Sequence, residues 1–410
     1  MLDSFQKKSI QTNEILDSTD DSARKILILF GTRPELIKLA PVVFGLKKHP
    51  RFQTVVVSSS QHTDLLAPFL KIFKLKIDYD LRVMTANQTP TLVCAKVLSA
   101  LDAILDEEKP DLILVQGDTT TAFAGAFAAF NRRIKIGHVE AGLRSGNPVS
   151  PFPEELNRRL ISQLATIHFC ATKGNKRNLL RENIAEDPIY VTGNTVVDAL
   201  EFILKNEQPS RKIERLIDET RNFKRILLTT HRRESFGLTM SDNLKILCKF
   251  IEKNKDVCLI FPVHPNPNVR NVTRKILANR ERIFLLEPLD YIDFAQLMKA
   301  AWLIVSDSGG VQEEAPSLGK PLFILRENTE RPEAIESGIA KLVGENLREL
   351  LAENYADDAW INSVKQIKNP FGDGAAAKRI VGILEKVFNV EAQRRKEKKK
   401  EKKTEKSLAV

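Results

Sequence analysis

The feature that most constrains the fold is a repeated alternation of short apolar runs with longer amphipathic stretches. The apolar runs are rich in Val, Ile and Leu, and stretches such as 34–48 and 89–107 have the length and periodicity of helices. Buried strands separated by helices form parallel sheets with helices on both faces. The predicted strands fall into two series: 25–30, 54–58, 111–115, 135–139 and 189–192, then 225–230, 257–262, 283–286, 302–306 and 321–325.

A polar and charged segment, residues 205–224, separates the two series and predicts a domain boundary near residue 205. We therefore expect an α/β protein with an N-terminal Rossmann-like domain at 23–204 and a C-terminal, nucleotide-binding one at 205–373. A closing helix is predicted at 374–390. In doubly wound sheets, ligands bind beyond the carboxyl ends of the strands, so the site is expected in a cleft that the two domains face.

Half of the net charge lies at the end of the chain. The protein carries +10 at pH 7, but residues 391–410 contain nine Lys or Arg and four Glu, which gives +5. This basic run and residues 1–22 lack an apolar pattern and are expected to be disordered tails. A modest basic excess in the folded body suits an anionic small substrate, and no nucleic-acid partner is expected.

The cysteines and the N-terminus favour a cytoplasmic protein. Cys94, Cys170, Cys248 and Cys258 lie in apolar segments and form no C-x-x-C pair, a pattern typical of buried thiols in a reducing compartment. A metal site is therefore not expected. The sequence has no apolar run as long as a membrane span and no signal-peptide pattern, so no membrane partner is predicted.

Two cations follow the first predicted strand. Thr32 and Glu35 form a capping-box pattern, and Pro34 suits the first turn of a helix. This local role does not account for Arg33 and Lys38, which lie where the end of a strand opens a crevice and suit a pyrophosphate. The sequence contains neither G-x-G-x-x-G nor G-x-x-x-x-G-K-[ST], so no nicotinamide cofactor or P-loop is predicted.

Three carboxylates follow successive elements of the first domain. Asp118 comes after one strand, Glu140 ends the next, and Glu154 opens a helix. Asp118 alone would serve as a helix cap, and Glu154 alone as a partner of the helix dipole. Together, the three carboxylates favour acid–base catalysis. His138 alternates with Glu140 and is expected to face the same way.

His231 follows the first predicted strand of the second domain directly. The segment with Arg33 has the corresponding position in the first domain. Arg232 and Arg233 follow His231, and His264 is similarly placed after the next strand. A lone His is more often structural than functional. The position of His231 at the carboxyl end of a strand favours a functional role.

A run of small residues follows a later strand of the second domain. Ser308, Gly309 and Gly310 let backbone N–H groups at a helix N-terminus approach a phosphate. Glu314 comes about one and a half helical turns later, within reach of the ribose hydroxyls. Arg331 adds a cation from a loop. A tight turn would explain the glycines but not the glutamate, and the motif indicates a nucleoside diphosphate.

These residues resemble the non-hydrolysing UDP-N-acetylglucosamine 2-epimerase family. The matching strings run in order from residue 25 to about 390 and cover nearly all of the folded chain. They are GTRPELIKLAP, QGDTTT, GHVEAGLRSG, PFPEELNR, VTGNTVVDAL, HRRESFG, PVHPNPNVR and SDSGGVQEEAPSLGKP with ERPEA. The resemblance implies a GT-B-type twin-Rossmann fold and a cytoplasmic homodimer that serves cell-surface polysaccharide synthesis.

The resemblance also implies roles for individual residues. Phe294 matches the residue beside the uracil, and Ser308, Gly309, Glu314 and Arg331 match phosphate and ribose contacts. Positions at or near the reacting sugar and the pyrophosphate match Arg33, Lys38, Asp118, Glu140, Glu154 and His231. An activating second substrate site in some bacterial members matches Gln61, Glu154, Arg232 and His264. Asp64 and Asn87 depart from the Gln and Arg expected at that site.

The implied reaction inverts C2 of UDP-N-acetylglucosamine to give UDP-N-acetylmannosamine, through elimination of UDP to a 2-acetamidoglucal and re-addition. It requires fixed positive charge at the pyrophosphate, carboxylates at C2 and a closed cleft, but no cofactor. We expect Asp118 and Glu140 near C2, Glu154 as a relay, and His231 on the pyrophosphate side. The alternatives are a GT-B-type glycosyltransferase, a hydrolysing epimerase, an epimerase of a diacetamido uronic acid nucleotide, and a non-enzymatic UDP-sugar sensor.

Overall fold

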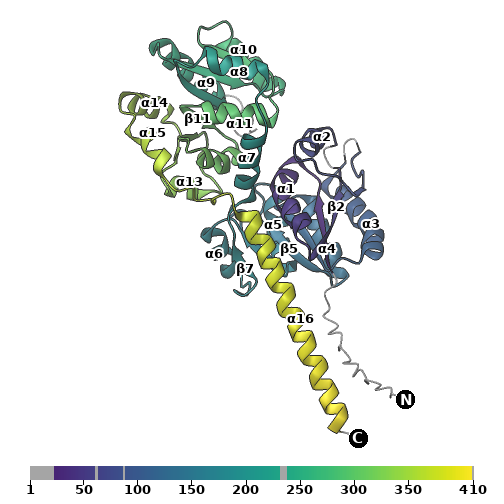
Figure 1. Ribbon diagram of the computed structural model, residues 1–410. Helices are drawn as coiled ribbons and strands as arrows, with labels where there is room; N and C mark the ends of the chain where they lie inside the picture. The colour runs from purple at the N-terminus through teal and green to yellow at the C-terminus, as the bar shows by residue number, and fades with distance from the viewer. Residues whose placement is uncertain (1–22, 61–62, 86–87, 231–237, 409–410) are drawn as a thin grey trace, which may run out of the picture.

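The computed structural model describes residues 23–60, 63–85, 88–230 and 238–408, and the predicted N-terminal tail, 1–22, lies outside them. Within these residues, two parallel sheets each form the centre of one domain (Figure 1). The first sheet has the order β3-β2-β1-β4-β5-β6-β7 and the second the order β10-β9-β8-β11-β12-β13. This arrangement confirms the predicted α/β fold of two Rossmann-like domains.

The first domain matches its predicted strands and adds β3 and β6. Its strands are β1 (Arg24–Phe30), β2 (Phe52–Ser58), β3 (Tyr79–Asp80), β4 (Leu112–Gln116), β5 (Lys135–Val139), β6 (Ile167–Cys170) and β7 (Ile189–Val191). Its helices are α1 (Arg33–Lys48), α2 (Thr63–Ile72), α3 (Pro90–Glu108), α4 (Thr120–Asn131), α5 (Glu154–Leu164), α6 (Lys173–Arg181) and α7 (Thr195–Asn206).

The second domain matches its predicted strands and adds β13. Its strands are β8 (Lys224–Thr229), β9 (Val257–Pro262), β10 (Ile283–Leu286), β11 (Leu303–Ser306), β12 (Leu322–Ile324) and β13 (Ala340–Leu342). The α-helices that follow α7 are α8 (Arg211–Glu219), α9 (Leu238–Lys253), α10 (Pro267–Leu277), α11 (Tyr291–Ala300), α12 (Gly309–Glu314), α13 (Pro332–Glu336), α14 (Leu347–Ala356), α15 (Ala359–Ser363) and α16 (Ala376–Leu408), with 3-10 turns η2 (Pro316–Leu318) and η3 (Val364–Gln366).

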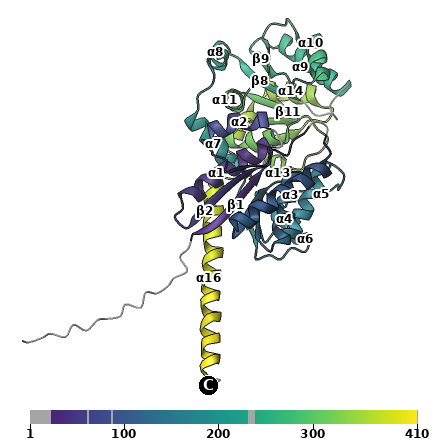
Figure 2. The ribbon, with the colours of Figure 1, turned by 90° about the vertical axis from the view of Figure 1, so that its right-hand side faces the viewer.

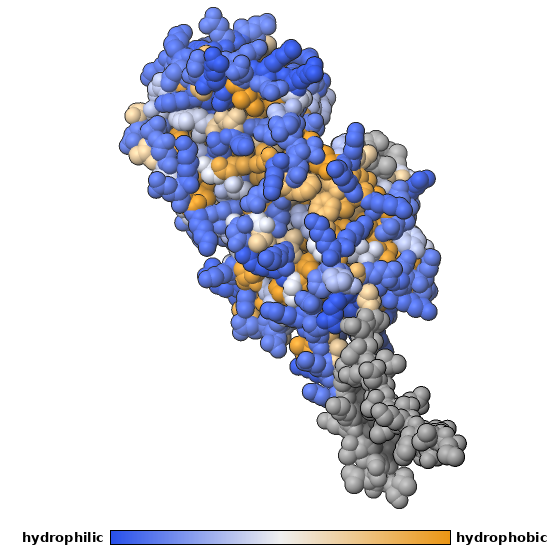
Figure 3. Space-filling view, viewed as in Figure 1, coloured by the Kyte–Doolittle hydropathy of each residue, from blue (hydrophilic) through white to orange (hydrophobic). Residues whose placement is uncertain are grey.

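Strand β1 shows how the apolar runs build the core. Its residues alternate between the two faces of the sheet: Ile26 and Ile28 pack in the cluster that contains α1 and α7, and Leu27 and Leu29 pack against α3 and α4. The first cluster continues into the second domain, where it includes apolar residues of α11 and α12. Figure 3 shows apolar side chains gathered around α1 and α7, where the domains meet. This shared core joins the two domains.

The segment before α7 contacts the segment through which the chain returns from the second domain. Gly193 and Asn194 precede α7, Phe371 lies where the chain returns from the second domain, and the backbone N–H of Asn194 donates to the Phe371 carbonyl at 2.7 Å. A Cβ on Gly193 would lie 3.4 Å from the Cα of Gly372, so the two glycines pack against each other, both with positive φ. Glycine tolerates this backbone conformation at little cost.

The closing helix is longer than predicted. Helix α16 begins at Ala376, where the Asp198 carboxylate accepts hydrogen bonds from the N–H groups of Ala376 and Ala377, and packs along α1. It then continues to Leu408 and projects from the body (Figure 2), whereas residues 391–410 were expected to be disordered. The run 391–408 contains no Gly or Pro and is rich in Lys and Glu, which are good helix formers.

Candidate functional site

The predicted site residues lie where the carboxyl ends of the strands in the two sheets face each other. Lys38 lies on α1, which follows β1, and Asp118 follows β4. From the second domain, Ser308 follows β11. The Nζ atom of Lys38 lies 2.9 Å from Oε2 of Glu313 on α12, so the two domains contact each other directly at the site.

Helix α1 starts with the predicted capping box. Oε2 of Glu35 accepts hydrogen bonds from the N–H groups of Gly31 at 3.0 Å and Thr32 at 2.7 Å, and from the Thr32 hydroxyl at 2.8 Å. Its Oε1 accepts from the Thr119 hydroxyl at 2.7 Å. Burial raises the pKa of Glu35 to about 7 against the opposing effect of these bonds. The network fixes the first turn of α1, and with it the position of Lys38.

Four charged side chains form a chain across the domain interface. Lys38 contacts the carboxylates of Glu140 and Glu313, and Nε of Arg331 donates to Oε1 of Glu313 at 2.6 Å. The four side chains are 2–11% exposed. Burial lowers the pKa of Lys38, but the two carboxylates outweigh it and raise the pKa to about 12. Burial raises the pKa of Glu313, but Arg331 and Lys38 bring it down to about 2.

Glu140 leaves the direction of its strand. It follows β5 and has a left-handed backbone, with φ +65°, which is rare for a residue other than glycine and is often found at functional sites. Nδ2 of Asn194 donates to its Oε2 at 3.4 Å. Burial raises the pKa of Glu140, an effect that Lys38 opposes and Glu313 reinforces. A buried carboxyl group with a raised pKa beside an ammonium group is suited to proton transfer.

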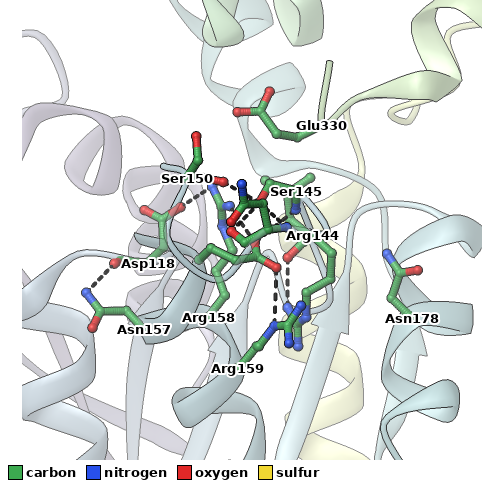
Figure 4. A network of polar contacts seen from close by, with 12 residues as sticks. Asp118, Arg144, Ser145, Ser150, Asn157, Arg158, Arg159, Asn178 and Glu330 are labelled. Atoms are coloured by element: carbon green, nitrogen blue, oxygen red, sulfur yellow. Dashed lines mark hydrogen bonds and ion pairs between the residues drawn. The ribbon is translucent and has the colours of Figure 1, made fainter. Parts of the chain in front are cut away.

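Asp118 is held by a buried arginine. Nη2 of Arg158, on α5, lies 2.5 Å from Oδ2 of Asp118, and Nδ2 of Asn157 donates to the Asp118 carbonyl at 2.9 Å. Figure 4 shows Arg158 between Asp118 and the loop that carries Ser145 and Ser150. Arg158 therefore holds the carboxylate of this turn, and its neighbour Asn157 holds the backbone.

His138 supports the Asp118 turn from the neighbouring strand. Its Nε2 lies 2.8 Å from the carbonyl oxygen of Gly117, and burial lowers its pKa to about 3. His138 is fully buried, and because Glu140 turns away from the strand, the expected alternation of His138 and Glu140 on one face does not describe the structure. The neutral imidazole is a positioning group for the turn.

Two further predicted residues, Glu154 and His264, are described, and several others lie outside the described residues or side chains. Glu154 begins α5, and its Oε2 is buried without a hydrogen-bond partner among the described residues. His264 is exposed, and its Nδ1 accepts a hydrogen bond from the Asn266 N–H at 3.2 Å. The remaining positions lie outside the described residues or side chains: His231, Arg232, Arg233, Gln61, Asn87 and the side chain of Asp64.

The small-residue motif forms the start of α12. Ser308 is its N-cap residue, and Gly309 and Gly310 are the first helical residues. A Cβ on Gly309 would lie 3.0 Å from Nη1 of Arg331, so a larger residue would push against the guanidinium group beside the helix start. The N-terminus of α12 and Arg331 therefore form one electropositive corner.

Glu314 lies beside Tyr291, which in turn contacts a second aromatic ring. The Tyr291 hydroxyl donates to Oε1 of Glu314 at 2.6 Å, and burial raises the pKa of Glu314 to about 7. The Tyr291 ring lies 5.7 Å from that of Phe69, over which the exposed Arg33 guanidinium lies at 5.8 Å. Phe294 follows Tyr291 on α11 and is half-buried.

Sequence reasoning missed four residues of this site. Glu313 joins Lys38 to Arg331, Tyr291 holds Glu314, and the other two are Arg158 and Asn194. Glu313, Arg158 and Asn194 lie inside strings already noted for their neighbours, so their positions gave a signal that was not used. Tyr291 lies outside those strings.

The geometry suits an anionic ligand with a reacting centre near carboxylates. Lys38, Arg331 and the start of α12 provide positive charge, and Glu140 and Asp118 provide carboxylates on the side of the first domain. Within the described residues, no group of three His, Cys, Asp or Glu side chains is arranged to hold a metal ion.

Comparison with known proteins places the chain in a family. A family model described as UDP-N-acetylglucosamine 2-epimerase matches residues 45–385. The UDP-N-acetylglucosamine 2-epimerase of Salmonella typhimurium is 45% identical over 369 residues, which cover 88% of this chain and 98% of that protein. The enzyme of the same name from Bacillus subtilis is 45% identical over 360 residues, or 87% of this chain and 94% of that one.

Solved structures agree with these matches. The UDP-GlcNAc 2-epimerase of Neisseria meningitidis bound to UDP-GlcNAc has a TM-score of 0.81 and 42% identity, and the match covers 88% of this chain and 100% of that one. The Methanocaldococcus jannaschii enzyme in complex with UDP-GlcNAc and UDP has a TM-score of 0.73 and 37% identity over 88% and 99% of the two chains. Across the described residues, no helix is both long and apolar enough to span a membrane. The motifs, the paired parallel sheets and these matches show that the chain belongs to the UDP-N-acetylglucosamine 2-epimerase family.

Proposed function

We propose that this protein interconverts UDP-N-acetylglucosamine and UDP-N-acetylmannosamine by inverting C2, without hydrolysing the nucleotide. The observation that carries the proposal is the buried chain of Lys38, Glu140, Glu313 and Arg331, which gathers cations and a candidate acid–base carboxylate between the domains. The substrate follows from relatives named UDP-N-acetylglucosamine 2-epimerase and from a solved relative that holds UDP-GlcNAc.

The proposed mechanism is elimination followed by re-addition. C2 of the sugar carries an acetamido group rather than a carbonyl, so its proton becomes removable only as a bond to C1 breaks. A carboxylate takes the C2 proton, the C1–O bond electrons leave with UDP, and a C1=C2 double bond forms in a 2-acetamidoglucal. A proton is then delivered to the other face of C2, and the UDP oxygen re-forms its bond to C1. Atoms and charge balance without any other reactant.

The site offers positive charge for the leaving group. As the C1–O bond breaks, negative charge grows on the UDP pyrophosphate, and fixed cations stabilise that charge more strongly in the transition state than in the ground state. We assign this role to Arg33, Lys38, Arg331 and the start of α12 at Ser308–Gly310. His231 is proposed to act on the same side.

The carboxylates would carry the proton chemistry. Glu140 is suited to it by its buried position and raised pKa, and Asp118 by the fixed geometry that Arg158 imposes. We propose that these two act near C2 and that Glu154, whose buried Oε2 has no hydrogen-bond partner in the described part of the chain, relays protons. At the nucleotide, Glu314 is proposed to bind the ribose and Phe294 to lie beside the uracil.

Proton NMR of UDP-GlcNAc with the EDTA-treated protein in D2O tests the proposal. We expect the C2 proton signal to disappear as UDP-N-acetylmannosamine forms. An intact sugar nucleotide with no exchange at C2 would refute the proposal and leave a glycosyltransferase or a UDP-sugar sensor. Release of free UDP and N-acetylmannosamine would show the hydrolysing reaction instead.

We also propose that the protein is a homodimer that pairs through α3, α4 and α5. These helices lie side by side (Figure 2) and expose large apolar side chains. Leu92, Phe127, Phe130 and Leu160 are 44%, 39%, 54% and 39% exposed. Contiguous exposed apolar residues mark protein interfaces.

Light scattering on a size-exclusion column tests the dimer. It should give twice the chain mass for the wild type and for a Leu180→Lys control, and the mass of one chain for Phe130→Lys. A monomeric wild type would refute the dimer.

A further inference from the structure

Glu313 has no part in the nucleotide contacts proposed above, although it lies at the centre of the site. Its side chain is 2% exposed, and its two oxygens are directed to different domains. Oε2 lies 2.9 Å from Nζ of Lys38 in the first domain, and Oε1 accepts a hydrogen bond at 2.6 Å from Nε of Arg331 in the second. A carboxylate in this position joins two cations that are proposed to stabilise the leaving UDP.

Burying a carboxylate is costly unless cations compensate it, and a single hydrophobic residue of similar size would avoid that cost. The helix itself also does not require a charge at this position. Helix α12 runs from Gly309 to Glu314 through backbone hydrogen bonds, and its N-cap residue is Ser308. The position of Glu313 is therefore explained by what it does to Lys38 and Arg331 rather than by the stability of the helix.

Lys38 is shared between two carboxylates. Its ammonium group contacts both Glu140 and Glu313, so the positive charge that Glu140 experiences depends on how strongly Glu313 holds the same ammonium group. We propose that Glu313 is a positioning residue that seats Lys38 and Arg331 for the leaving diphosphate and, through the shared Lys38, sets the protonation balance of Glu140. This inference rests on the proposed function, because it assigns a role to Glu313 within that reaction.

The consequence for pH dependence follows from the charges around Glu140. The groups that face it are Lys38 on α1, Asn194 at the start of α7, Glu313 on α12 and Arg331 at the start of α13. The negative charge of Glu313 raises the pKa of Glu140. Neutralising Glu313 removes that repulsion and leaves Lys38 to Glu140 alone, so the pKa of Glu140 should fall.

Glu313→Gln keeps the shape and removes the charge, and Glu313→Asp keeps the charge and shortens the side chain. In Glu313→Gln we expect kcat to fall by roughly 10- to 100-fold, because the two cations lose their common anchor. The acid limb of the kcat/KM profile should move to lower pH by about one unit, because Glu140 then ionises more easily. UDP should bind several-fold more tightly to this variant, because one competing anion is gone.

Glu313→Asp should lose activity but keep the wild-type acid limb and UDP affinity. Glu333→Gln is the matched control: Glu333 also contacts the other domain, by accepting a hydrogen bond from the Thr172 hydroxyl, and no contact joins it to Lys38 or Arg331 among those described. It should leave the acid limb unchanged. Circular dichroism and thermal melting establish that each variant is folded.

The test combines NMR rates of C2 exchange across pH with calorimetric titration of UDP, for the wild type and the three variants. An inactive wild type would refute the proposed function, and the titration would still decide whether Glu313 competes with a bound diphosphate. An active wild type with a Glu313→Gln variant of unchanged acid limb and UDP affinity would overturn the inference and leave the epimerase assignment intact.

Discussion

Replacement of Arg158 by Met should destabilise the first domain and impair the site together. Arg158 is 5% exposed, and its guanidinium lies 2.5 Å from Asp118 and 3.1 Å from the fully buried Glu155. Removing one partner of a buried ion pair costs about 3–5 kcal/mol, because the remaining charge stays buried. Glu155 would keep its bonds from the Ser145 N–H at 2.9 Å and from Nε of Arg159 at 3.3 Å, so we expect the lower end of that range. For a domain of this size, about 3 kcal/mol lowers Tm by about 6–12 °C.

Thermal melting followed by circular dichroism checks this magnitude, with Arg159→Met as the control. Arg159 contacts the same Glu155, but its side chain is 38% exposed, so its loss should cost less than about 1 kcal/mol. C2 exchange in Arg158→Met should fall by at least about tenfold, because the Asp118 carboxylate loses the group that orients it. The double variant Arg158→Met with Glu155→Gln should recover part of the lost Tm, since the buried anion is gone. If Arg158→Met and Arg159→Met melt together, the reasoning about the buried pair is refuted.

Three further predictions concern a cap, a glycine and two histidines. Asn194→Ala should lower the free energy of unfolding by about 1 kcal/mol, because it removes the N-cap of α7. It should also slow C2 exchange, because Asn194 contacts Glu140. Unchanged exchange in NMR would exclude that second role. Gly309→Ala should weaken calorimetric UDP binding, because its Cβ would lie 3.0 Å from Arg331, whereas Gly382→Ala meets nothing within 4 Å and should bind UDP normally. Burial lowers the pKa of His138 to about 3 and of His168 to about 4, below the usual 6.5. The unfolded chain therefore binds more protons, so the free energy of unfolding should fall as pH drops from about 6.5. Urea titrations across pH should show a shallower fall for His138→Gln. A fall as steep as that of the wild type would contradict this reasoning.

The fold was largely readable from the sequence because buried parallel strands are near-continuous apolar runs. Strand β6 was missed because it is short and carries His168 in its middle, and β13 because it spans only Ala340–Leu342 with Lys341 between. The end of α16 was missed because a charged run gives no apolar period, although its residues favour a helix.

The site was readable to the extent that each residue follows a strand. Position along the chain placed Arg33, Lys38 and Glu314 at the correct edges of the sheets. The pairing of Lys38 with Glu313 depends on how the two domains pack, which no local pattern encodes. The turn of Glu140 away from its strand depends likewise on a left-handed backbone conformation that period-two alternation does not predict.

The return of α16 to the first domain has a consequence for biosynthesis. Ile380, Leu384 and Phe388 belong to the same apolar cluster as Ile26 and Ile28 of β1, and Val381 packs against Gly45 of α1. The first half of the chain therefore leaves the ribosome with part of its core uncovered, while the second sheet, β8 to β13, is complete in one continuous stretch. Translation runs from the N-terminus, so the domain made first is the one that completes last, and until then its exposed apolar surface is a place for a chaperone to bind.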